Sequence, residues 1–133
     1  MITLRQARAV IAAGEAKAAA IGVPVNIAVL DAGAHLKTFS RMDGSALGSI
    51  DIAMRKARTA VLFQAASEAV WEYCKPGAPA PGLELTNGGL APFAGGIPLT
   101  GPDGGMIGAV GVSGGTVPQD SDIAQAAVAA LVA

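Results

Sequence analysis

The sequence has little charge, few aromatic residues, one histidine and one cysteine. Charged residues make up 14% and aromatic residues 4% of its 133 residues, whereas an average globular domain is about 25% charged. Because so few charged side chains are available to cover a monomer, we expect a homo-oligomer. A formal net charge of -1 provides no cationic excess, so we expect no nucleic-acid partner.

The chain also lacks the usual signals of export and of membrane insertion. The single cysteine, Cys74, cannot form an internal disulfide, so nothing indicates an oxidising compartment. Residues 1–4 show no basic start and no apolar core of a signal peptide. No run reaches the roughly 18 apolar residues of a membrane span. We therefore expect a cytoplasmic protein without a membrane partner, in which Cys74 is a buried, unreactive thiol.

The length fits one domain over residues 1–133, and apolar residues at helical spacing predict four helices. The predicted helices cover residues 3–21, 49–64, 67–74, and 116 to about Val132. Two of them begin with capping-box spacing, Thr3 with Gln6 and Thr116 with Gln119. The proline- and glycine-rich residues 75–84 are predicted to form a loop.

Apolar or alternating segments predict four strands. These cover residues 25–30, 35–42, 92–99 and 106–113. The first two are close enough to form an antiparallel hairpin, and Pro92 and Pro98 place the third at a sheet edge or a bulge. Helices alternating with antiparallel strands indicate an α+β domain with helices packed on the sheet.

His35 follows the turn of the predicted hairpin and is the only histidine. An accessible imidazole in such a position can serve as an axial ligand to haem iron. The simpler alternative is a surface histidine that hydrogen-bonds within its turn. A non-haem metal site would need a cluster of ligands, which one histidine and one cysteine do not supply.

Residues 111–115 match the G-x-S-x-G pattern of a hydrolase nucleophile, with Ser113 at the serine position. The match ends there, because the only histidine precedes the serine instead of following it. A better interpretation is a glycine-rich corner between strand and helix, where the free amides of Gly114 and Gly115 favour a carboxylate or phosphate. The alternative is a turn that needs glycine for its backbone angles alone.

Four charged residues complete the set of site candidates. Arg41 can orient an anion by bidentate contacts, and Lys56 offers a second cation. Asp43 and Asp120 are candidate acid–base groups. Ordinary alternatives exist: Asp43 can cap a turn or pair with Arg41, and Lys56 can be a solvated lysine.

Several segments together carry a family resemblance. They are Asp31-Ala32-Gly33-Ala34-His35-Leu36, Arg41-Met42-Asp43-Gly44, residues 51–57, 93–99 and 108–114, and the helix start at Asp120. In this order the chain resembles the GlcG/HbpS family, which includes the C-terminal domain of PduO-type cobalamin adenosyltransferases. The resemblance implies a profilin-like α/β/α sandwich with a five-stranded antiparallel sheet, assembled as a tetramer to octamer. For some members it implies haem binding or breakdown, iron binding, or attachment to a corrinoid enzyme.

Three hypotheses for function follow. The first is an oligomeric cytoplasmic protein that binds haem or a related tetrapyrrole, with His35 on the iron and Arg41 or residues 113–115 on a propionate. The second is a small enzyme or accessory factor of organic-acid catabolism, an isomerase or lyase, using the four charged candidates. The third is a purely structural subunit. The first two need the hairpin tip and the glycine corner to converge on one hollow, completed by a neighbouring chain.

Overall fold

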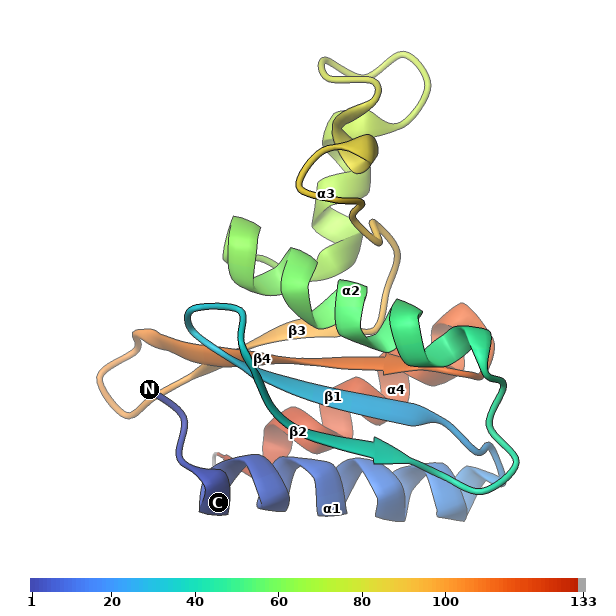
Figure 1. Ribbon diagram of the computed structural model, residues 1–133, viewed down its shortest axis with the longest axis vertical. Coiled ribbons are helices and arrows are strands. Elements are labelled where there is room, and N and C mark those ends of the chain that lie inside the picture. Colours follow the sequence, from blue (N-terminus) through green and yellow to red (C-terminus); the bar gives the residue numbers. More distant parts are fainter. Residues whose placement is uncertain (132–133) are drawn as a thin grey trace.

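The computed structural model describes residues 1–131 and contains a four-stranded antiparallel sheet between two layers of helices (Figure 1). The strands are β1 (Asn26–Asp31), β2 (Leu36–Arg41), β3 (Gly96–Thr100) and β4 (Met106–Ser113), in the sheet order β2-β1-β4-β3. The helices are α1 (Leu4–Ile21), α2 (Gly48–Phe63), α3 (Ser67–Cys74) and α4 (Val117–Ala129), with a 3-10 turn η1 (Leu83–Leu85). The predicted α+β class is confirmed.

The sheet has four strands among the described residues, so the fifth strand implied by the family resemblance is wrong. The residue patterns themselves predicted four strands, and these are the four observed. Residues 75–95, between α3 and β3, form turns and η1 instead of a strand. The prolines at 76, 79 and 81 remove backbone donors there, and a strand needs those donors to pair.

The predicted ends of the elements are largely confirmed. Both capping boxes form: the Thr3 hydroxyl accepts the Gln6 backbone N–H at 3.1 Å, and Thr116 accepts that of Gln119 at 3.3 Å. Helix α4 ends at Ala129 and residues 130–131 form a turn, so the last helix is shorter than predicted; Val132 itself lies outside the described residues. The strand predicted over 92–99 begins only at Gly96, and β3 is an edge strand with an irregular register after Leu99, as its prolines indicated.

The two faces of the sheet are covered differently. Helices α1 and α4 pack on one face over large aliphatic side chains such as Val10, Ile27 and Ile123. Helix α2 covers the other face, mainly with alanines, and so lies close to the strands. At Gly111 of β4 an added Cβ would lie 2.0 Å from the Ala53 carbonyl oxygen of α2. Gly111 is therefore required for the close approach of α2 to β4.

Residues 64–95 form an arm that projects from the α2 side of the sandwich and contains α3 and η1 (Figure 1). Cys74 is buried within it, as predicted, and burial raises the pKa of its thiol. The arm nevertheless exposes large apolar side chains, among them Trp71, Tyr73 and Leu85. Of the helices in residues 1–131, none combines the length and the apolar character needed to cross a membrane.

Candidate functional site

The tip of the β1–β2 hairpin holds the single histidine in a defined position. Asp31 Oδ1 accepts the backbone N–H groups of Gly33 at 2.9 Å and His35 at 3.0 Å. The hydrogen bond from His35 is the main reason that the pKa of Asp31 is lowered. His35 Nδ1 lies 3.4 Å from the same oxygen, while 81% of the imidazole side chain is exposed. This contact occupies the Nδ1 side of the ring and leaves Nε2 available to an external ligand.

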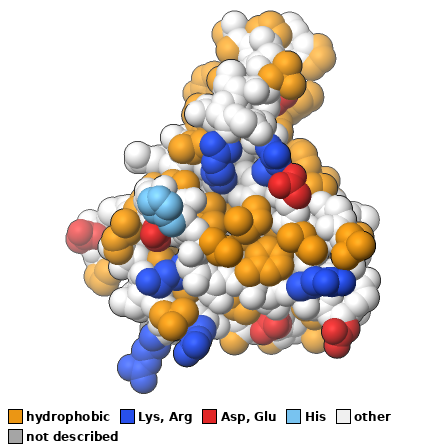
Figure 2. All heavy atoms as spheres, viewed as in Figure 1, with side chains coloured by type: hydrophobic (Ala, Val, Ile, Leu, Met, Phe, Trp, Pro, Cys, Tyr) orange, Lys and Arg blue, Asp and Glu red, His pale blue; other side chains and the backbone are white. Residues whose placement is uncertain are grey.

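A groove of about 320 Å³ lies beside this tip, between the hairpin and α2. Its apolar part includes Leu30, Ala34 and Met54, and its charged part consists of Arg55, Arg58 and Asp51, which together leave one net positive charge. We call it the hairpin groove. Figure 2 shows the pale-blue histidine at one end of an apolar area, with Lys and Arg side chains above that area. The groove thus combines an apolar wall with positive charge next to an imidazole.

The two arginines of the hairpin groove differ in how they are held. Arg55 Nε donates to Asp51 Oδ2 at 2.6 Å, an i,i+4 ion pair on α2. Arg55 Nη1 also donates to the Gly89 carbonyl at 2.9 Å, which ties the arm to α2. Arg58 forms no ion pair within residues 1–131. Its charge therefore remains free for an anionic group of a ligand.

These residues fit a haem group by the chemistry of their donors. A haem needs an imidazole or similar ligand on iron, an apolar surface for the macrocycle and cations for the propionates. Here the imidazole is that of His35. The apolar surface is the wall of the neighbouring hairpin groove, and the cation is Arg58. A carboxylate on the second ring nitrogen is the usual companion of a metal-binding histidine, and Asp31 occupies that place.

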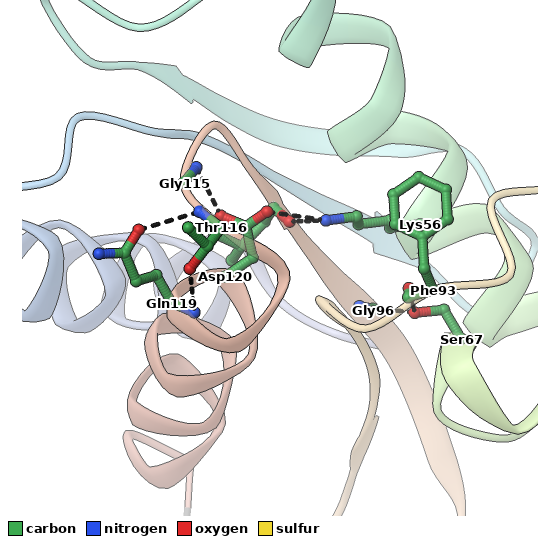
Figure 3. Close-up of polar contacts among 9 residues, drawn as sticks. Lys56, Ser67, Phe93, Gly96, Gly115, Thr116, Gln119 and Asp120 are labelled. Atoms are coloured by element: carbon green, nitrogen blue, oxygen red, sulfur yellow. Dashed lines mark hydrogen bonds and ion pairs between the residues drawn. The ribbon is translucent and has the colours of Figure 1, made fainter.

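Lys56 and Asp120, two of the sequence candidates, meet in the interior (Figure 3). Lys56 Nζ donates to Asp120 Oδ2 at 3.0 Å and to the Val112 carbonyl at 2.8 Å. The other carboxylate oxygen, Oδ1, accepts the Gly115 backbone N–H at 2.8 Å. The side chains are only 1% and 4% exposed, so the expectation of a solvated lysine is wrong. The reason is tertiary: α2 lies on the sheet with Lys56 turned toward β4 and α4.

The remaining side of the ammonium is covered by an aromatic ring. Lys56 Nζ lies 5.0 Å from the centre of the Phe93 ring, a cation–π contact. Ser67 fixes this segment, because its hydroxyl donates to the Phe93 carbonyl at 2.6 Å and accepts the Gly96 N–H at 2.9 Å. Burial lowers the pKa of Lys56, and the Asp120 carboxylate opposes that decrease. Two hydrogen bonds, the Phe93 ring and near-complete burial leave the Lys56 ammonium inaccessible to a substrate anion.

The glycine corner and the hairpin tip lie at opposite ends of β1 within one chain. Asn26 pairs with Ser113, whereas Asp31 pairs with Gly108. The five residue steps between them span about 17 Å, which exceeds the distance from iron to propionate in a haem. The expected hollow therefore does not form within a chain, because antiparallel pairing puts the start of β1 beside the end of β4.

The other corner candidates gather at the end of the sheet away from His35. Arg41 pairs with Asn26 and so lies two strands from Ser113. Arg41 and Asp43 are exposed and form no ion pair with each other among residues 1–131. Ser113 is 5% exposed, and the Gly115 amide is already bound by Asp120, which leaves Gly114 as the open part of the corner.

Sequence reasoning missed the role of the α2 arginines. Neither Arg55 nor Arg58 appeared among the site candidates. Their i,i+3 spacing places both on one helical face, which could have identified them as a pair. Only the packing of α2 beside the hairpin shows that this face borders the groove. No three His, Cys, Asp or Glu side chains of residues 1–131 gather as a metal ion would require.

Comparison with known proteins supports the family resemblance. Residues 2–129 match the family model described as haem degrading protein HbpS-like. An uncharacterized 15.0 kDa protein of Citrobacter freundii is 42% identical, over 96% of this chain and 89% of that protein. The corrinoid adenosyltransferase PduO of Salmonella typhimurium is 40% identical over 86% of this chain, but the match spans only 34% of PduO.

A solved structure extends the comparison to three dimensions. The crystal structure of a PduOC:heme complex has a TM-score of 0.92 and 36% sequence identity, and the match covers 97% of this chain and 94% of that one. The sequence matches extend over nearly the whole chain, and the architecture agrees with them. The protein therefore belongs to the HbpS-like family.

Proposed function

We propose that this protein is a haem-binding protein whose single histidine, His35, ligates the iron. The observation that carries the proposal is the similarity, at 36% identity and a TM-score of 0.92, to a domain crystallised as a heme complex. The hairpin groove supports it from this chain's own residues. When bound, the haem would supply iron-centred redox and ligand chemistry, while the chain would hold and orient it.

Each part of the hairpin groove has a role in this proposal. His35 Nε2 would bind the iron, and Asp31 would orient the ring from Nδ1. Leu30, Ala34 and Met54 would cover part of the macrocycle, and Arg58 would pair with a propionate. Arg41, Ser113, Gly114 and Gly115, the other haem contacts proposed from the sequence, could reach the same haem only from a neighbouring chain.

A hemin titration tests this proposal. We expect wild-type protein to give a saturable shift of the Soret band, and His35→Ala to abolish it, because the chain has no second imidazole. Asp31→Asn should weaken binding by about tenfold through loss of ring orientation. Thr38→Ala is the matched control: Thr38 pairs with Val29, which faces the α1 side of the sheet.

The possible outcomes distinguish two questions: whether His35 is the iron ligand, and whether the protein binds haem at all. An unchanged Soret shift in His35→Ala would show that another group binds the iron, and haem binding itself would stand. No shift in the wild-type protein would refute haem binding. Equal loss in Thr38→Ala would show that the effect comes from disturbance of the hairpin.

We further propose that the chain works in the cytoplasm as a homo-oligomer, a tetramer to octamer. Low charge and the exposed apolar side chains of Tyr73 and Leu85 in the arm support assembly, because burying them removes apolar surface from water. Light scattering on the purified protein should give a mass four to eight times that of one chain. A monomeric mass at micromolar concentration would refute the assembly proposal.

A further inference from the structure

A second pocket, of about 360 Å³, opens between the arm and the start of α4. It shares no residue with the hairpin groove. We call it the aromatic pocket. It is lined by Glu68, Trp71, Pro92, Phe93, Ala94 and Val117.

Two aromatic rings and one carboxylate define the chemistry of this pocket. Glu68 and Trp71 are three residues apart on α3, so they are neighbours on one helical face. Phe93 comes from the segment that Ser67 fixes to α3. Trp71 and Phe93 are 42% and 39% exposed, so their rings are available to a ligand. Indole and phenyl faces attract cations, indole most strongly.

The charges around the aromatic pocket favour the same kind of ligand. The ammonium of Lys56, which lies against the Phe93 ring, is neutralised by Asp120 at 3.0 Å. Glu68 forms no ion pair or hydrogen bond among residues 1–131. Lys56, Asp120 and Glu68 together therefore carry one net negative charge, and Glu68 is the one charged group that lines the pocket.

We propose that the aromatic pocket binds a small organic cation, a quaternary or alkylated ammonium group, between Trp71 and Phe93 with Glu68 as the counter-charge. The apolar substituents of such a cation would contact Pro92 and Val117, and its charge would face the rings and the carboxylate. An anion would meet the Glu68 charge and find no free cation in the lining. A neutral apolar ligand would gain only the apolar contact.

Fluorescence tests the proposal directly, because Trp71 is the only tryptophan of the chain. The purified full-length protein is titrated with choline chloride, with sodium chloride as the ionic-strength blank. A parallel titration uses 3,3-dimethylbutan-1-ol, the uncharged isostere of choline. We expect a saturable change in emission with choline and about tenfold weaker binding of the alcohol, the ratio that a cation–π contribution of about 1.4 kcal/mol gives.

Three variants identify the groups responsible. Glu68→Gln should weaken choline binding about threefold and leave the alcohol unchanged, because exposed charge pairs contribute little. Phe93→Leu should also weaken choline binding about threefold and leave binding of the alcohol unchanged, because it removes one aromatic ring and keeps an apolar side chain at that place. Glu72→Gln is the matched control, since Glu72 lies on the same helix, pairs with Lys75 and does not line the pocket. Equal affinity for choline and the alcohol would overturn the proposal, as would the absence of saturation with choline.

Discussion

Replacing Lys56 by methionine should lower the free energy of unfolding by about 3–5 kcal/mol. The substitution preserves most of the side-chain volume and removes the charge. Asp120, 3% exposed, would then keep a buried carboxylate with the Gly115 N–H as its remaining partner. Urea unfolding of the wild type and the variant, followed by circular dichroism, measures the difference.

The cost should arise from the unpaired charge, and a double-mutant cycle can show this. Asp120→Asn alone should also destabilise the protein, because Lys56 and Gly115 donate to different oxygens of Asp120 and the amide NH2 would replace one of these acceptors by a donor. Together the two changes should cost about 2 kcal/mol less than the sum of the single ones. Strictly additive effects would contradict a direct coupling between the two side chains.

A surface ion pair provides the matched control for this experiment. Lys75 pairs with Glu72 on α3, but the two side chains are 43% and 64% exposed. Solvent screens such a pair, so Lys75→Met should change the free energy of unfolding by less than about 0.5 kcal/mol. A loss comparable to that of Lys56→Met would show that removal of a lysine charge is costly wherever it occurs in this chain.

Gly111→Ala should destabilise the protein by about 3 kcal/mol or more, or prevent folding. The added Cβ would lie 2.0 Å from the Ala53 carbonyl oxygen and 2.6 Å from the Ala57 amide nitrogen. Both are backbone atoms of α2, so a side-chain rotation cannot relieve the contact and the helix must move off the sheet. Soluble yield, and urea unfolding where the variant folds, measure the effect.

Two further variants distinguish this backbone contact from a general intolerance of alanine. At Gly48, in the first turn of α2, an added Cβ would meet nothing within 4 Å, so Gly48→Ala should be neutral or slightly stabilising. Adding Ala57→Gly to Gly111→Ala should not restore stability, because it removes a side chain and leaves the backbone atoms in place. Full rescue by Ala57→Gly would show that the conflict lies with the Ala57 methyl group.

The buried pair and the hairpin groove divide the candidate residues into two kinds. Lys56 and Asp120 join α2, α4 and the end of β4, and their donors and acceptors are used within the protein. Arg58 lines the groove and His35 follows Ala34 of its lining, and both have bonding capacity left for a ligand. This difference favours the haem hypothesis over an acid–base enzyme built on Lys56 and Asp120.

Local patterns in the sequence determined the elements of the fold. Helix starts at Thr3 and Thr116 could be predicted because a capping box is formed by residues three positions apart. An edge or bulge position for the third strand could be predicted from its prolines, and Pro98 of β3, which cannot donate to a second neighbouring strand, does lie at the edge. The family could be identified for a related reason, since its short segments occur in a fixed order along the chain.

The candidate site depended on contacts between distant residues, which the sequence alone could not supply. Lys56 and Asp120 are 64 residues apart, and only the packing of α2 and α4 around β4 makes the lysine a buried partner instead of a solvated one. The pairing of Asn26 with Ser113 places the glycine corner at the opposite end of β1 from the hairpin tip that carries His35. The groove beside that tip is therefore lined by side chains of α2 instead. Short-range sterics and hydrogen bonding fix helices, caps and turns, whereas strand register and helix placement decide which side chains meet.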